Sequence, residues 1–176
     1  MIDLQKVAAA VAAGDPSAFP RLVEATQERL VRLSARLLGS VAEAEDVVQE
    51  AYLRAYRALV AGRFDGRASV ATWLHRIVVN ATLDAKRARK NAPPPTEAAP
   101  ETGFDGAPAT EARVALRELA AWLGALPEEQ QVVLVLKAVE DLSSAEIAEI
   151  VGCSEGAVEQ RLVRARATLR KMEGAR

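Results

Sequence analysis

The sequence predicts an all-α protein in which two small helical domains, the second containing a helix-turn-helix, are joined by a flexible proline-rich linker. Alanine, leucine, arginine and glutamate dominate, apolar residues recur at the helical period of about 3.6 residues, and β-branched alternation is rare. Residues 91–110 break this pattern with five prolines, two glycines and almost no large apolar side chain. Such a segment cannot bury enough surface to offset the ordering of its backbone. We therefore expect domains at 1–90 and 111–176, with the linker 91–110 between them.

The helical period predicts five helices in the first domain and four in the second. They are expected at 4–13, 17–38, 42–61, 69–80, 83–90, 110–125, 128–139, 144–151 and 154–173. Asn80, Ala81 and Thr82 form a short polar interruption between the fourth and fifth of these helices, so a loop is predicted there. A small polar loop beside a basic helix offers a pocket for an unstacked nucleic-acid base.

The last two predicted helices form the most informative pattern. Gly152 stands at the end of the first, where a left-handed residue is favoured, and Ser154 can cap the second. Five apolar residues fall where two short crossed helices would bury them against each other: Ile147, Ala148, Val151, Val158 and Leu162. This pattern is typical of a helix-turn-helix, whose second helix enters the major groove of DNA. An ordinary αα-hairpin with a basic surface is the alternative that this segment alone leaves open.

The composition argues against enzymatic chemistry. One cysteine, Cys153, and one histidine, His75, leave no disulfide, no cysteine metal cluster, no histidine metal pair and no conventional nucleophile–base couple. There is no glycine loop that would cradle a phosphate. We therefore expect no catalytic residue, metal, cofactor or small-molecule substrate. No apolar run approaches the roughly 18 residues of a membrane span, and residues 1–6 lack a secretory layout, so a cytoplasmic chain without membrane insertion is expected.

The charges are strongly separated although the net charge is only −1. Cations gather between Arg54 and Lys90 and again from Arg161 to the end, while acids gather at 43–50, in the linker and before the turn. Two basic zones far apart in the sequence indicate two places that touch phosphate. Solvated helix faces remain the alternative for either zone taken singly.

The predicted helix 42–61 carries an outward stripe opposite its apolar face. This stripe contains Asp46, Gln49, Glu50, Leu53 and Arg57. A leucine set among carboxylates suits a protein-docking surface with an apolar centre and a polar rim. An acidic face that only promotes solubility is the alternative.

Several segments together resemble one bacterial family. Residues 45–50 (EDVVQE) and 69–80 (SVATWLHRIVVN) resemble the N-terminal domain of extracytoplasmic-function sigma factors, members of the sigma-70 family. Residues 126–131 (LPEEQQ) and the turn motif through Arg166 resemble their C-terminal domain. The resemblance covers nearly the whole chain in the family's domain order, with a variable linker between, and this ordered combination is highly specific.

The resemblance implies a dissociable subunit of bacterial RNA polymerase that directs the core enzyme to chosen promoters. Core polymerase, through its β′ clamp and β subunit, and promoter DNA are the implied partners, and an anti-sigma factor is a further one. Matched by position, Asp46, Gln49 and Glu50 bind the clamp, and the face argument adds Leu53. Contacts with the −10 element fall to Arg76, Asn80, Ala81, Thr82, Lys86, Arg87 and Arg89.

The last helix would read the −35 element. The candidate residues are Glu155, Glu159, Gln160, Arg161, Val163, Arg164 and Arg166. Resembling proteins often carry Arg or Lys at the position of Glu159, so an acid there puts the usual −35 preference in doubt. Glutamine can pair with adenine and glutamate can accept from the cytosine amino group. We expect Glu159 and Gln160 to contribute to promoter choice, and the three arginines to engage phosphate or neighbouring acids.

Two other classes of protein compete with this interpretation. A one-component helix-turn-helix repressor would explain the second domain but would leave the stripe of 42–61 and the loop at 80–82 without a purpose. An adaptor that binds only a protein would leave both basic zones without a function. Cys153 lies at the turn, where a small apolar residue fits, so packing is favoured over redox sensing.

Overall fold

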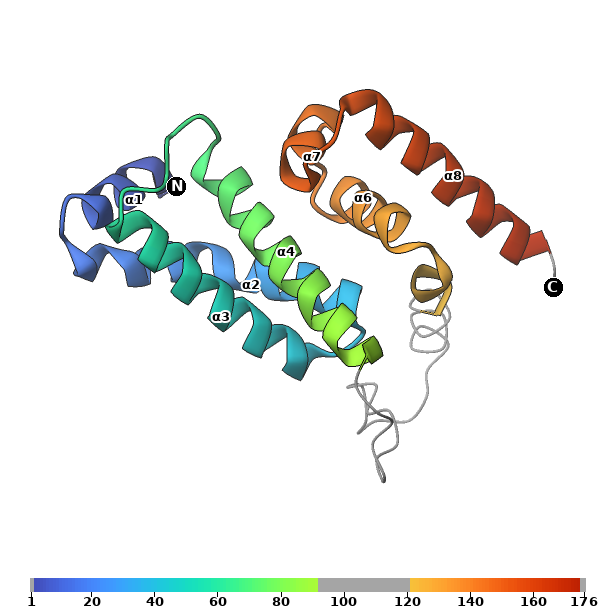
Figure 1. The fold of residues 1–176 in the computed structure, drawn as a ribbon, viewed down its shortest axis with the longest axis horizontal. Coiled ribbons are helices and arrows are strands. Elements are labelled where there is room, and N and C mark those ends of the chain that lie inside the picture. Colours follow the sequence, from blue (N-terminus) through green and yellow to red (C-terminus); the bar gives the residue numbers. More distant parts are fainter. Residues whose placement is uncertain (1, 92–120, 175–176) are drawn as a thin grey trace, which may run out of the picture.

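The computed structural model describes residues 2–91 and 121–174, and within these ranges every regular element is a helix (Figure 1). The helices are α1 Leu4–Ala12, the 3₁₀ turn η1 Pro16–Ala18, α2 Phe19–Leu38, α3 Val41–Val60, α4 Val70–Asn91, α6 Glu128–Val139, α7 Ser144–Val151 and α8 Glu155–Gly174. Residues 121–125 are also helical. The all-α prediction is confirmed. Apart from Asn91, the last residue of α4, the predicted linker 91–110 lies outside the described residues, and the domain boundaries remain a prediction.

The helices α1 to α4 form the N-terminal group, in which α2, α3 and α4 lie side by side (Figure 1). Each turns an apolar face inward, because apolar residues recur every three or four positions. The largest fully buried side chains of this group are Val11, Leu22, Leu30, Leu33, Leu59, Val70, Leu74 and Val78. Local signals fix the helix ends: Ser40 caps α3 through the amide of Glu43 at 3.3 Å, and Gly39 ends α2 in the left-handed region.

The helices α6 to α8 form the C-terminal group, and α7 and α8 make the predicted helix-turn-helix. Gly152 ends α7 with φ 70° and ψ 43°, as the sequence predicts. The hydroxyl of Ser154 accepts from the amide of Ala157 at 3.2 Å and so caps α8. Ser143 and Glu146 add a reciprocal capping box at the start of α7. The turn is therefore held at both of its ends.

The loop expected at Asn80, Ala81 and Thr82 does not exist, and this prediction is wrong. These residues lie inside α4, which runs without a break from Val70 to Asn91. Ala81 is 5% exposed and Thr82 is fully buried. The buried Thr82 hydroxyl has two hydrogen-bond partners. It donates to the carbonyl of Val78 at 2.7 Å and shares a hydrogen bond with the Ser34 hydroxyl of α2 at 2.9 Å. A short polar run can thus continue a helix when its hydroxyls find partners within the fold.

The two groups pack against each other. Helix α7 contacts α4, and α6 contacts α2. The buried apolar side chains of both groups belong to one continuous cluster. None of the helices in the described residues is long and apolar enough to span a membrane.

Candidate nucleic-acid interface

The outward stripe of α3 is exposed as predicted. Asp46, Gln49 and Glu50 all face solvent, and Leu53 beside them is 48% exposed. Spacings of three, four and seven residues put these four side chains on one side of the helix. Glu50 pairs with Arg54 one turn later at 3.3 Å, a surface contact that contributes little stability. An exposed leucine with acidic neighbours on a regular helix offers a flat docking face.

Helix α4 carries the candidate residues for the −10 element. Arg76 and Asn80 are exposed on it. Because Ala81 and Thr82 are buried, neither side chain is available to touch DNA in this conformation. The structure therefore brings Arg76 and Asn80 to the surface and removes their two predicted neighbours from it.

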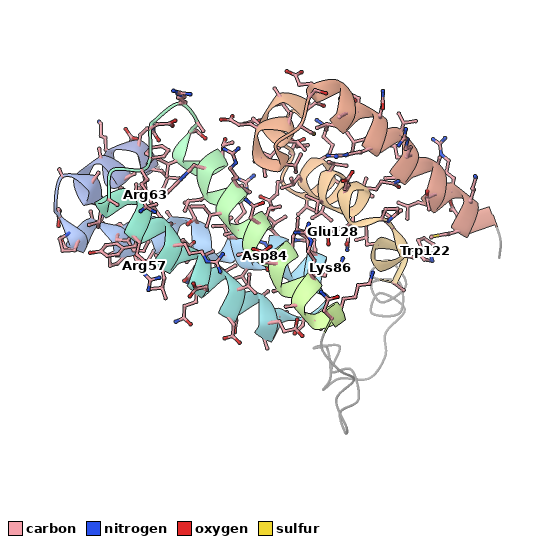
Figure 2. The ribbon with its side chains drawn as sticks, viewed as in Figure 1. Arg57, Arg63, Asp84, Lys86, Trp122 and Glu128 are labelled. Atoms are coloured by element: carbon pink, nitrogen blue, oxygen red, sulfur yellow. The ribbon has the colours of Figure 1, made fainter. Side chains whose placement is uncertain are left out.

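The three candidate cations near the end of α4, Lys86, Arg87 and Arg89, are already engaged. Lys86 donates to the side-chain oxygen of Gln131 on α6 and lies beside Glu128 (Figure 2). Burial lowers the pKa of Lys86 below its usual 10.5, although Glu128 opposes this effect. Arg87 donates to Glu128 at 2.6 Å.

Arg89 is held inside the N-terminal group. Its guanidinium pairs with Glu43 of α3 at 3.1 Å and donates to the carbonyl of Leu38 at 3.2 Å. These contacts tie the end of α4 to the start of α3. Arg89 therefore also secures the helices. Lys86 and Arg87, by contrast, both contact α6, and Arg87 also pairs with Asp84 of α4 at 3.6 Å.

The outward face of α8 carries the candidate −35 residues. Six of the seven are exposed: Glu155, Glu159, Gln160, Val163, Arg164 and Arg166. Val163 is 64% exposed, a value that packing within the chain does not explain. The opposite face is buried through Val158, Leu162 and Ala165, which confirms the predicted burial of Val158 and Leu162.

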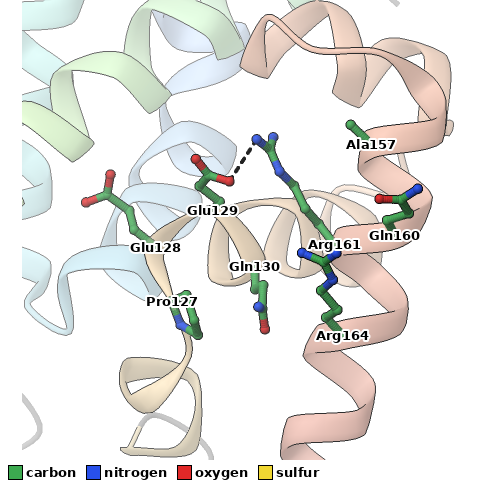
Figure 3. A pocket seen from close by; sticks show the side chains of 8 residues that line it. All are labelled: Pro127, Glu128, Glu129, Gln130, Ala157, Gln160, Arg161 and Arg164. Carbon is green, nitrogen blue, oxygen red and sulfur yellow. Dashed lines mark ion pairs between the residues drawn. The ribbon is translucent and has the colours of Figure 1, made fainter.

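Arg161 is the exception among these seven. Its guanidinium pairs with Glu129 of α6 at 2.8 Å and donates to the Cys153 sulfur at 3.3 Å. This ion pair borders a hollow between the start of α6 and α8, with Gln160 and Arg164 at its edge (Figure 3). Of the two roles expected for the arginines, phosphate or a neighbouring acid, Arg161 has the second. Cys153 itself packs against the buried cluster.

Glu159 is oriented by the helix before the turn. Its carboxylate accepts a hydrogen bond from the hydroxyl of Ser144, in the first turn of α7. Negative charge is favoured there because the amides of a helix start point outward. Glu159 is thus an exposed acid whose direction is fixed by the helix-turn-helix itself.

A polar cluster between the two groups was not anticipated from the sequence. Glu140, at the end of α6, has a side chain only 2% exposed and pairs with Arg29 of α2 and His75 of α4. Burial alone would raise the pKa of Glu140, but hydrogen bonds from His75 and Arg29 outweigh it and hold the pKa below the usual 4.5. Nothing in the spacing of residues 111 positions apart signals such a contact.

No group of three or more metal-binding side chains occurs in ranges 2–91 and 121–174. The exposed candidate residues form three surfaces: an acidic and apolar face on α3, a basic one on α4 and a mixed one on α8.

Comparisons with known proteins agree with this arrangement. Residues 22–92 match the family model described as Sigma-70 region 2, and residues 116–169 match Sigma-70, region 4. The ECF RNA polymerase sigma factor SigW of Bacillus subtilis is 36% identical over 90% of this chain and 90% of its own. The RNA polymerase sigma-H factor of Pseudomonas aeruginosa is 34% identical over 95% of this chain and 92% of its own.

Solved structures show the same fold. CnrH, solved in complex with the cytosolic domain of CnrY, is 31% identical with a TM-score of 0.74 over 96% of each chain. The sigma factor RpoE of Bartonella quintana, solved with the anti-sigma factor NepR, covers 89% of this chain and 96% of its own with a TM-score of 0.68. At 21% identity it supports the fold alone.

Two helical groups with a helix-turn-helix in the second, together with the matches to two sigma-70 regions, identify a DNA-binding transcription initiation factor. The chain belongs to the extracytoplasmic-function sigma factors of the sigma-70 family. Its function is to direct RNA polymerase to promoters.

Proposed function

We propose that this sigma factor binds the core polymerase through the outward stripe of α3, formed by Asp46, Gln49, Glu50 and Leu53. The observation that carries this proposal is the exposure of Leu53 at 48%, beside the acidic residues of the stripe and ahead of Arg57. Burying a leucine inside a polar rim provides affinity through the apolar centre and orientation through the charges. The β′ clamp and the β subunit are the polymerase surfaces that the family resemblance suggests.

DNA contacts are divided between two helices. On α4, the exposed Arg76 and Asn80 face the −10 element, while Lys86, Arg87 and Arg89 supply charge for its backbone. On α8, Glu159 and Gln160 read −35 base edges, and Arg164 and Arg166 contact phosphate, with Glu155 and Val163 beside them. Arg161 acts through Glu129 to hold α8 on α6. Ala81 and Thr82 are not part of this proposal because they are buried.

Opening the −10 region unstacks bases at a cost of a few kcal/mol, which contacts to a flipped base offset. Each DNA surface alone binds weakly and with strong dependence on salt. Joined in one chain and fixed on the polymerase, the second contact gains from effective concentration. The chain needs no catalytic residue of its own, since RNA synthesis belongs to the core enzyme. It works in the cytoplasm, where the polymerase is.

An anti-sigma factor is the further partner. The similarity to CnrH, which was solved with the cytosolic domain of CnrY, supports a sigma factor that a second protein can hold. No residue of this chain identifies that protein.

The test is initiation by purified chain and core polymerase from a library of genomic promoters. The variant is Asp46→Ala, Gln49→Ala and Glu50→Ala together, and we expect its affinity for core polymerase to fall by at least about tenfold, as for loss of interface hot spots. Unchanged affinity would contradict the docking proposal. A repressor would bind duplex DNA alone and start nothing, and an adaptor would do neither.

The chain offers a matched control on α2. Glu24, Gln27 and Glu28 have the same chemistry, the same spacing and the same exposure as the α3 triplet. Replacing all three by alanine changes the net charge equally. Polymerase affinity should then stay within about twofold of the parent, since the scatter of neutral surface substitutions is about 0.5 kcal/mol.

A further inference from the structure

The contact between the two helical groups has a charged centre. The Glu140 carboxylate accepts from Arg29 and from the Nε2 of His75 at 3.2 Å, and Arg29 also donates to the backbone carbonyl of Glu140 at 2.8 Å. Nδ1 of His75 lies 2.7 Å from the carbonyl of Ala71. Both ring nitrogens therefore lie within hydrogen-bonding distance of oxygen atoms, one on α4 itself and one at the end of α6. Arg29, His75 and Glu140 are called the Glu140 cluster below.

The backbone directs Glu140 into this contact. Asp141 follows it in the left-handed region with φ 51°, which is uncommon for a residue other than glycine. The chain thereby reverses immediately after α6. Lys137 donates to the carbonyl of Leu142 at 3.0 Å and stabilises the reversal. Glu140 therefore projects from a fixed corner rather than from a free loop.

The same interface occupies cations of α4. Gln131, only 2% exposed, accepts from Lys86, and Glu128 accepts from Arg87 at 2.6 Å. Glu128 and Lys86 lie between α4 and α6 (Figure 2). Oxygen atoms of α6 thus take a donor from Lys86 and from Arg87, two of the three cations that the proposed function assigns to the DNA backbone. A phosphate and these side chains cannot both hold the same N–H groups.

We infer that the packed arrangement is a self-inhibiting closed state, in which the Glu140 cluster holds the two groups together while α6 occupies Lys86 and Arg87. Promoter DNA engages α4 fully only after the groups separate. This inference rests on the proposed role of α4 in DNA binding.

The chemistry of the cluster suits a contact that must open. Burying charges costs hydration, and their mutual attraction in the interior offsets that cost only in part. When the groups separate, the buried His75 and Glu140 regain water, whereas the Arg29 side chain is already 49% exposed. By contrast, changing Glu140 while the contact stays closed removes the acid that Arg29 and His75 share, which disfavours the closed state. Substitutions of Glu140 should therefore open the chain.

The experiment measures closure and DNA binding separately on the full chain. Fluorophores are attached at Ala9→Cys in α1 and Arg170→Cys in α8, in a Cys153→Ser background, because both new sites are exposed. Glu140→Lys places a cation against Arg29. Glu149→Lys on α7 is the matched control, since Glu149 is exposed, makes no ion pair with described residues, and changes the net charge equally.

Glu140→Lys should lower energy transfer between the groups, whereas Glu149→Lys should leave it at the parent value. The probe is a fluorescent pool of random single-stranded DNA at fixed salt. We expect Glu140→Lys to bind it at least about tenfold more tightly than Glu149→Lys, because a state that is closed nine-tenths of the time lowers apparent affinity by that factor. Glu140→Gln, which keeps the shape, should give intermediate values and serves if Glu140→Lys does not fold.

Unchanged energy transfer in both Glu140 variants would overturn the inference. So would an opened chain whose DNA affinity equals that of Glu149→Lys, since occupation of Lys86 and Arg87 would then not limit binding. Neither readout involves polymerase, so failure of the closed state is distinguishable from failure of the proposed function. An opened chain that binds DNA but never supports initiation would refute the function and leave the closed state intact.

Discussion

Replacing Thr82 by valine tests whether this residue supports the fold or touches DNA. Its hydroxyl lies 2.9 Å from that of Ser34 and 2.7 Å from the carbonyl of Val78, and both Thr82 and Ser34 are fully buried. Valine keeps the shape and removes the hydroxyl. The substitution therefore removes the buried hydrogen bond to Ser34 between α2 and α4, together with the bond to Val78 within α4.

The expected loss follows from the group that is left behind. A buried donor or acceptor without its partner costs about 1–3 kcal/mol, whereas removing both partners is nearly neutral. Ser34 can turn toward a carbonyl of its own helix, which favours the lower part of that range. We expect Thr82→Val to lower the free energy of unfolding by about 1–2 kcal/mol. In the double variant with Ser34→Ala, the loss should be smaller than the sum of the single losses by about 1 kcal/mol.

The assay is urea denaturation followed by circular dichroism, with the slope of the transition compared between variants. Promoter opening by the holoenzyme is measured on the same proteins at a temperature where all are folded. Thr82→Val should open promoters as the parent does. If its unfolding free energy stays within about 0.5 kcal/mol of the parent while promoter opening is lost, Thr82 contacts DNA and its assignment as a buried structural residue is refuted.

Three other predictions concern the C-terminal group. In Gly152→Ala, the added Cβ meets no atom within 4 Å, so the substitution costs only the strain of a left-handed backbone. We expect it to lower the free energy of unfolding, measured in urea, by about 1–2 kcal/mol. An unchanged free energy would mean that the backbone of the turn relaxes. Glu159→Arg should change the preferred −35 base pairs selected from a random library, and identical selections would exclude Glu159 as a reader. The pKa of Glu140 is depressed in the closed state, so the carboxylate stabilises that state fully above its usual 4.5 and progressively less below it. Energy transfer should therefore fall with acid in the parent and show no such step in Glu140→Gln.

The helix-turn-helix was predictable because its determinants are local. Gly152, Ser154 and the apolar spacing of α7 and α8 each fix a backbone state or a face within a few residues. The stripe of α3 was predictable for the same reason, since helical geometry alone puts Asp46, Gln49 and Leu53 on one side. Exposure of Leu53 follows once the opposite face of α3 is buried.

The two failures have a different origin. Asn80, Ala81 and Thr82 suggested a loop because short polar residues favour turns, but a hydroxyl of α2 and a carbonyl one turn earlier satisfy Thr82 in the helix. Tertiary contacts therefore outweighed the preference of these short polar residues for a turn. Contacts with α6 and its end engage Lys86, Arg87 and His75, and they join residues far apart in the sequence. The charge pattern alone does not predict which acid pairs with which base.

The position of the α3 stripe sets an order of events. Helix α3 packs mainly on α1, α2 and α4, and its outward face takes no part in the contact with α6 and α7. The polymerase can therefore bind the closed chain before its two helical groups separate. Genomic DNA, by contrast, meets a closed molecule in which α6 engages Lys86 and Arg87. We therefore expect the free chain to bind genomic DNA weakly and to reach its full DNA affinity only after it has bound the polymerase.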